Sequence, residues 1–77
     1  MIKNIPNKYS QKMVIKELNV QFNDKFDFFY LPIDFVNKCN MGYAFINLKD
    51  FRYVDNFYKE FNNKKWPKFN SKKVCKI

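Results

Sequence analysis

The 77-residue chain contains no histidine, one glycine, one arginine and two cysteines. Zinc sites in proteins are usually built from about four clustered cysteine or histidine ligands, whereas Cys39 and Cys75 lie far apart in the sequence. We therefore expect no metal site and no cofactor. The two cysteines are expected to be free thiols, as in proteins of reducing compartments.

Long hydrophobic runs are also absent. No window holds the ~18 consecutive apolar residues of a membrane-spanning helix. The N-terminus lacks the apolar run of about 7–15 residues that marks a signal peptide. We expect a protein of the nucleus or the cytoplasm that does not bind membranes.

Positive charge and aromatic side chains are abundant instead. The net charge is +8, and ten Phe, five Tyr and one Trp make up 21% of the residues. A strongly basic chain favours a polyanionic partner, nucleic acid before an anionic membrane surface; the alternative is that the charge serves solubility. Sixteen rings are more than so small a core needs, so some must lie on the surface.

The stretch Met41–Leu48 has the clearest strand pattern in the chain. Successive side chains of a strand point to opposite faces. One face therefore carries small and aliphatic residues, and the other carries Tyr43, Phe45 and Asn47. Two rings turned toward water need a reason, and stacking on unpaired nucleotide bases supplies one.

Two segments show the spacing of amphipathic helices. The first runs from Gln11 to Phe22 with Ser10 as its N-cap, and the second from Phe51 to Phe61 with Asp50 as its N-cap. The residues expected to face the core are Val14, Ile15, Leu18 and Phe22 in the first, and Val54, Phe57, Tyr58 and Phe61 in the second.

The remaining segments are strands and connections. The sequence predicts further strands at Met1–Ile5, Phe26–Pro32 and Lys73–Ile77, the last cut short by the end of the chain. A polar, hairpin-type connection spans Asp34–Asn40, and Trp66 and Pro67 are expected to fold back onto the core.

This order, β-α-β-β-α-β, predicts a ferredoxin-like α+β fold in a single domain spanning residues 1–77. Four antiparallel strands would carry two helices on one face and leave the other face open. The first and third strands form the central pair. Met1 and Lys3 are therefore expected beside Tyr43 and Phe45 on the open face.

The two central strands resemble the signatures of the RNA recognition motif, a single-stranded RNA-binding fold. Residues 42–45, Gly-Tyr-Ala-Phe, match the first signature, K/R-G-F/Y-G/A-F-V-x-F/Y, although Met41 and Leu48 replace its basic and closing aromatic residues. Residues 2–5, Ile-Lys-Asn-Ile, resemble the end of the second signature, and Met1 stands where an aromatic residue is usual.

The resemblance and the strand pattern together predict an RNA-binding face. Alignment of the second strand against Gly42 places Phe28 and Tyr30 outside and Phe29 and Leu31 inside. Rings would stack on bases, Asn47 would read base edges, and lysines would contact phosphates. The predicted RNA-binding residues are Met1, Lys3, Tyr30, Lys38, Tyr43, Phe45, Asn47 and Lys73.

Almost the whole chain resembles the C-terminal RNA recognition motif of the meiosis-regulating, Mei-two-like RNA-binding proteins. The strings NIPNKY, DFFYLPIDF and NKCN carry this likeness. The resemblance implies single-stranded RNA binding in a post-transcriptional regulator of meiosis or development.

Two alternatives remain open from the residues. The same fold serves as a protein-interaction module, in which the sheet or a helix face holds a partner or a second copy of the chain. A small enzyme of the acylphosphatase type would need a backbone anion cradle and a fixed guanidinium. With one glycine, one arginine (Arg52) and no histidine, we expect no catalysis.

Overall fold

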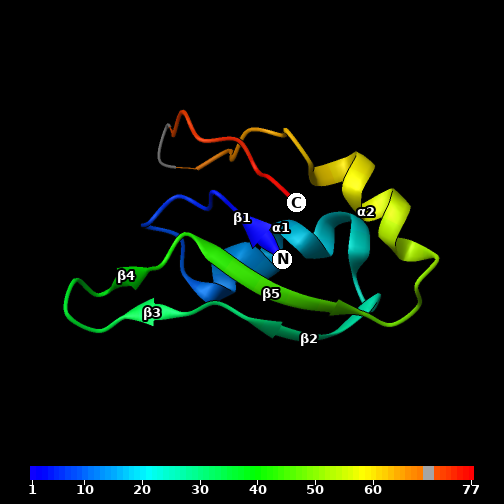
Figure 1. The fold of residues 1–77 in the computed structure, drawn as a ribbon, viewed down its shortest axis with the longest axis horizontal. Helices are drawn as coiled ribbons and strands as arrows, with labels where there is room; N and C mark the ends of the chain where they lie inside the picture. Colours follow the sequence, from blue (N-terminus) through cyan, green and yellow to red (C-terminus); the bar gives the residue numbers. More distant parts are fainter. Residues whose placement is uncertain (69–70) are drawn as a thin grey trace.

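The computed structural model describes residues 1–68 and 71–77 of the chain. It contains a three-stranded antiparallel sheet, two helices and a two-stranded hairpin that extends from one end of the sheet (Figure 1). Among the described residues, neither helix is long and apolar enough to cross a membrane.

The sheet has the strand order β1–β5–β2. In it, β1 (Ile2–Lys3) and β2 (Phe26–Tyr30) lie on either side of β5 (Tyr43–Leu48). Ile2 is paired with Ala44 and Lys3 with Tyr43, so the predicted central pair is confirmed.

The predicted last strand is present only in part. Lys3 and Lys76 exchange two backbone hydrogen bonds of 2.7 and 3.1 Å, which place the C-terminal segment beside β1. Isolated bridges Lys3–Lys76 and Lys65–Val74 replace a continuous strand. The C-terminal segment pairs only at single residues. Asn4, which has a φ of +65°, ends β1 directly after Lys3 and so limits the length of this pairing.

An irregularity in β2 determines which of its rings face outward. Phe26 is paired with Leu48 but Phe28 with Asn47, so one extra residue, Asp27, is accommodated between them. Beyond this bulge Phe28 and Tyr30 are exposed, whereas Leu31 is buried. The predicted facing of the second strand is confirmed.

Helix α1 (Gln11–Phe22) has the predicted bounds. It begins there because the Ser10 hydroxyl accepts a 3.2 Å hydrogen bond from the backbone N–H of Met13. Val14, Leu18 and Phe22 are fully buried, and they form the layer of the core beneath the sheet.

Helix α2 (Tyr53–Phe61) differs from the prediction in its start and in its buried side. Asp50 accepts the backbone N–H of Arg52 and closes a turn, so the helix begins two residues later than expected. Of the predicted stripe only Phe57 is fully buried; Val54 and Tyr58 are about half exposed.

The observed contact row of α2 explains this error. The rings of Phe57 and Phe61 lie 5.2 and 5.6 Å from the ring of Phe22 in α1. Tyr53 continues the same i, i+4 row and packs against the core. Because the helix docks along this single row, Val54 and Tyr58 lie on its flank.

Trp66 folds back onto the core as predicted. Its side chain is buried and packs edge-to-face on Tyr9, with a centroid distance of 5.2 Å. The Tyr9 hydroxyl accepts a 2.9 Å hydrogen bond from the backbone N–H of Lys68, and burial raises the pKa of Tyr9. The chain after α2 is thereby fixed to the start of α1.

The connection between the second and third predicted strands is itself a small ribbon. β3 (Ile33–Asp34) pairs with β4 (Cys39–Asn40), and we call residues 33–40 the hairpin arm. A 3.0 Å hydrogen bond from the backbone N–H of Met41 to the Pro32 carbonyl joins the arm to the sheet. In Figure 1 the arm extends away from α2, at the end of the longest axis of the molecule.

Candidate functional site

The face of the sheet opposite the helices carries four aromatic side chains. Phe28, Tyr30 and Phe45 are 54%, 52% and 44% exposed, and Tyr43 is partly buried. On the other side of β5, Ala44 is fully buried against the helices. We call these four residues, Phe28, Tyr30, Tyr43 and Phe45, the aromatic face.

Neighbouring rings of the aromatic face come from different strands. Tyr43 and Phe45 contact each other within β5, with centroids 5.7 Å apart and ring planes at 80°. Tyr30 of β2 lies directly opposite Phe45. The sheet therefore presents a row of rings across two adjacent strands.

A shallow hollow of about 610 Å³ lies next to the rings of Tyr43 and Phe45. Its lining residues are Met1, Lys3, Gly42, Tyr43 and Phe45. Lys3 pairs with Tyr43 across the strands and is exposed. The structure thus brings together four of the predicted site residues: Met1, Lys3, Tyr43 and Phe45. The hollow combines ring surface with one cation.

Gly42 shapes the edge of this hollow. Its φ is +89°, a region that L side chains rarely adopt, and its carbonyl accepts a 3.0 Å hydrogen bond from the N–H of Ile5. The single glycine of the chain therefore stands where the backbone turns into β5.

Of the other four predicted site residues, Tyr30 belongs to the aromatic face and three lie outside the hollow. Asn47 is exposed but donates a 2.9 Å hydrogen bond to the Asp27 carboxylate in the β2 bulge. Lys73 donates from Nζ to the side-chain oxygen of Asn7 at 2.9 Å, away from the hollow. Lys38 lies on the hairpin arm.

Asn40 is a residue of the site that the sequence did not reveal. It is the one buried polar residue among those the structure describes, and its side chain is 1% exposed. Its amide nitrogen donates to the carbonyls of Pro6 (2.8 Å) and Tyr9 (2.9 Å), and its oxygen accepts from the N–H of Gly42 at 2.7 Å. It thereby joins the hairpin arm, the loop before α1 and the start of β5.

The arginine of the chain is exposed and forms an ion pair with a neighbouring carboxylate. Arg52 donates from Nε and Nη2 to the Asp50 carboxylate, and this contact holds the pKa of Asp50 below its usual range. Lys49 pairs likewise with Asp24 at 2.7 Å. Neither pair lines the hollow, and Lys3 has no acidic neighbour among the lining residues.

The described part of the chain contains two free cysteines. It holds no group of three or more side chains that could bind a metal ion. Cys39 and Cys75 are free thiols, and burial raises the pKa of Cys75 to about 11.

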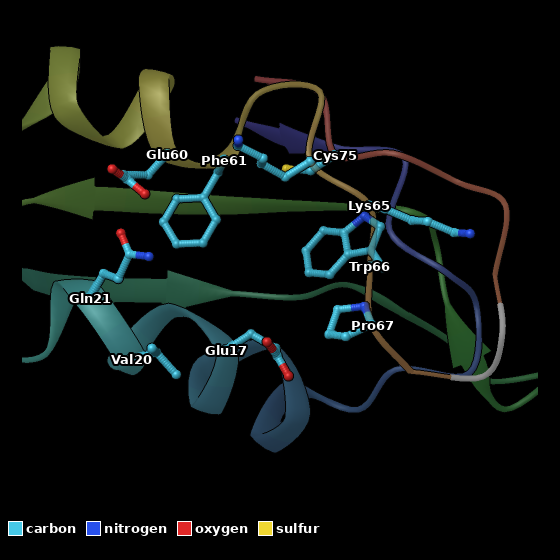
Figure 2. Close-up of a pocket in the computed structure, with 10 residues that line it drawn as sticks. Glu17, Val20, Gln21, Glu60, Phe61, Lys65, Trp66, Pro67 and Cys75 are labelled. Carbon is cyan, nitrogen blue, oxygen red and sulfur yellow. The ribbon is translucent and has the colours of Figure 1, made fainter.

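A second cavity lies on the helix side of the sheet. It measures about 360 Å³ and lies between α1, α2 and the segment that carries Trp66 (Figure 2). Figure 2 shows Glu17 on one wall and Glu60 on another, with Lys65 near Trp66. Glu17 and Glu60 line this cavity together with Lys64 and Lys65, so its lining carries no net positive charge that would attract a polyanion.

Comparison with known proteins identifies relatives along the entire chain. The family model described as RNA recognition motif 2 matches residues 1–77. Protein MEI2-like 4 from Arabidopsis thaliana is 57% identical and Protein MEI2-like 3 from Oryza sativa subsp. japonica is 56% identical, each over all 77 residues. The chain spans 8% of the length of each of these two relatives.

A solved structure has the same fold. The Rna15 RNA recognition motif, determined with bound RNA (GU), superimposes with a TM-score of 0.78 over 97% of this chain and 73% of the other. The two sequences are 16% identical, so the similarity establishes the ferredoxin-like fold.

Proposed function

Because this chain belongs to the RNA recognition motif 2 family, we propose that it binds single-stranded RNA on its aromatic face and catalyses no reaction. The observation that carries the proposal is the outward position of Tyr43 and Phe45 beside Lys3, on the side of the sheet that no helix covers. Aromatic rings on such a sheet stack on unpaired bases.

The geometry favours unpaired over double-stranded RNA. Bases stacked within a duplex hide their faces, whereas single-stranded bases can be splayed onto a flat surface. Tyr43, Phe45 and Tyr30 offer neighbouring surfaces across β5 and β2. Lys3 and the other lysines contribute the phosphate contacts, and Asn47 supplies an amide for base edges once a base displaces Asp27 from it.

The wider role is inferred from the relatives. The MEI2-like proteins are about twelve times as long as this chain, since it covers 8% of each. We infer that the chain supplies the RNA contact of a post-transcriptional regulator of meiosis or development, acting in the nucleus or the cytoplasm. The "MEI2-like" names of the relatives support this inference.

The test is calorimetric titration of short single-stranded RNAs into the chain and its variants. Tyr43→Ala and Phe45→Ala should each weaken binding about 5- to 150-fold, since one stacked base contributes about 1–3 kcal/mol. Tyr58→Ala is the matched control, because Tyr58 is 51% exposed on α2, away from the aromatic face. It should leave the affinity unchanged.

Salt dependence separates this function from a protein-interaction module. RNA affinity should fall steeply with salt as phosphate contacts are lost, whereas ring-to-peptide contacts should barely respond. If Tyr43→Ala and Phe45→Ala bind RNA as well as the unaltered chain does, the aromatic face is not the RNA site.

A further inference from the structure

The bulge in β2 places two consecutive side chains on the open side of the sheet. Phe26 and Phe29 pack against the core, whereas Asp27 and Phe28, which lie between them, are both exposed. A regular strand would send one of these two side chains to each face. The extra residue at the bulge therefore gives the aromatic face a carboxylate beside Phe28.

Asn47 of β5 holds this carboxylate on the open side of the sheet. Its side-chain amide donates a 2.9 Å hydrogen bond to Oδ1 of Asp27. Phe28 lies directly opposite Asn47 in the register of β2 and β5. An amide, a carboxylate and an exposed ring therefore meet beyond Tyr43 and Phe45 along β5.

The Asp27 carboxylate keeps acceptor capacity that no described residue uses. An ionised carboxylate offers about four lone-pair positions, and the Asn47 amide is the one hydrogen-bond donor to Asp27 among the described residues. The ion pairs of the same part of the chain involve other carboxylates. A carboxylate without an ion-pair partner repels phosphates, so its place on an RNA-binding surface needs a reason.

Guanine is the base whose edge matches these two side chains. Its Watson–Crick edge presents, in order, the O6 acceptor, the N1–H donor and an N2–H donor. Adenine, cytosine and uracil each present a single donor group on this edge, next to acceptors that a carboxylate repels. Asn47 supplies a donor for O6, and Asp27 supplies two acceptors. A guanine can therefore replace the hydrogen bond between them and leave neither side chain without a partner.

From this arrangement we propose that Asp27 and Asn47 form a guanine-reading site, in which the base stacks on Phe28 and its Watson–Crick edge bonds to both side chains. Asn47 Nδ2 donates to O6, and the two oxygens of Asp27 accept from N1–H and N2–H. The inference rests on the proposed function and deepens it, because it states which base the aromatic face selects at one position. Asp27 repels phosphates but is satisfied by this base, so it provides specificity rather than affinity.

Replacement of a single base in a uridine RNA tests the site by calorimetric titration. Uridine RNAs of about eight nucleotides would carry one central guanosine, inosine, adenosine or cytidine. Guanosine should strengthen binding about 5- to 150-fold over the all-uridine RNA, the discrimination typical of a bidentate base contact. Inosine lacks the 2-amino group of guanosine, so it should bind at least about fivefold more weakly than guanosine.

Two variants of equal charge separate base reading from a general effect of charge. Asp27→Asn keeps the size of the side chain but replaces an acceptor oxygen by a donor. It should reduce the preference for guanosine over uridine to about twofold or less. Asp55→Asn is the matched control, because Asp55 is exposed in the first turn of α2 and its replacement changes the net charge equally. It should leave the preference unchanged.

A third variant tests the amide. Asn47→Ala removes the donor to O6 but keeps the Asp27 carboxylate, so the preference for guanosine over uridine should fall by about fivefold or more. The ratio of affinities for guanosine and inosine should persist, because the 2-amino group bonds to Asp27.

The outcomes distinguish this inference from the proposed function. If no RNA binds, or if Tyr43→Ala leaves every affinity unchanged, the proposed function fails and the guanine site fails with it. If the RNAs bind through Tyr43 but guanosine and inosine bind equally, or another base is preferred, Asp27 and Asn47 do not read guanine. If Asp27→Asn weakens binding of all the RNAs to the same extent, Asp27 supports the bulge and reads no base.

Discussion

The side-chain amide of Asn40 joins three segments that are distant in the sequence. Its hydrogen-bond partners Pro6 and Tyr9 lie 34 and 31 residues earlier in the chain. Its oxygen also fixes the N–H of Gly42, where the backbone enters β5. This buried group therefore helps to hold the hairpin arm against the loop that carries Lys8.

Replacement of Asn40 by leucine should therefore destabilise the fold. The N–H of Gly42 would lose its partner, and the carbonyls of Pro6 and Tyr9 would each lose one hydrogen bond. Each buried group left unsatisfied costs about 1–3 kcal/mol. We expect a total loss of roughly 2–5 kcal/mol in the free energy of unfolding, measured by urea denaturation.

The matched control is Asn19→Leu, because Asn19 is exposed on α1. Surface changes of this kind usually stay within about 0.5 kcal/mol. If Asn40→Leu lowers the free energy of unfolding no more than the control does, the hydrogen bonds of Asn40 do not stabilise the fold.

At this scale the sequence predicted the rings of the face but not the residue that supports it. The facing of Tyr43 and Phe45 follows from a local alternation of period two, which any strand imposes. The role of Asn40 depends on contacts across more than 30 residues, and no local pattern encodes them. In the sequence, Asn40 shows only the polar character of a connection.

Among the elements, the hairpin arm has a tip whose order should depend on pH. The hydrogen bonds from Asn37 and Val36 lower the pKa of Asp34 in the folded chain. The stabilisation they provide is therefore fully present above the unfolded-state pKa of about 3.9 and is lost as pH falls through the lower, folded-state pKa.

We expect the amide resonances of Val36 and Asn37 to shift together in an NMR titration from about pH 6 to about pH 2.5, with a midpoint below about 3.9. Asp34→Asn removes the titrating group and should make both resonances independent of pH in this range. A midpoint at or above 3.9, or an unchanged titration in the variant, would exclude Asp34 as the cause.

Helix α2 shows how far element prediction reaches. Its existence and its end at Phe61 followed from periodicity and from the break at Asn62, but its buried side did not. Burial of Phe57 is compatible with several rotations of α2 about its own axis. The contacts of Phe57 and Phe61 with Phe22 of α1 select one of these rotations. Tertiary packing between helices therefore decided what the local pattern left open.

For the whole molecule, the order of elements and the central strand pair were predicted because each strand and helix carries its own local signal. The number of domains stays a prediction. The C-terminal segment was less predictable, because its attachment uses single contacts. Asn4 donates to the Val74 carbonyl at 2.9 Å, and Lys76 bonds the backbone of Lys3.

Cys75 offers a measure of this global packing. Its thiol is buried and its pKa is raised to about 11, so the reactive thiolate is scarce at about pH 8. Cys39 is only partly buried. A thiol reagent should label Cys39 quickly and Cys75 at the rate of global unfolding. Mass spectrometry measures the two rates.

Cys39→Ser should abolish the fast phase and leave the slow one, which urea should accelerate. Two fast labels in the native chain would mean that the C-terminal segment opens independently of the rest of the molecule.

The position of Trp66 has a practical consequence for spectroscopy. The only indole of the chain packs against Tyr9 in the core, on the helix side of the sheet, while Tyr30 and Tyr43 stand on the opposite side. Emission excited selectively from tryptophan therefore reports whether the chain is folded and is insensitive to what lies on the sheet. Tyr30 and Tyr43 are two of the five tyrosines, so a ligand on the aromatic face should quench part of the tyrosine emission. The two signals together distinguish a variant that has lost its ligand from one that has lost its structure.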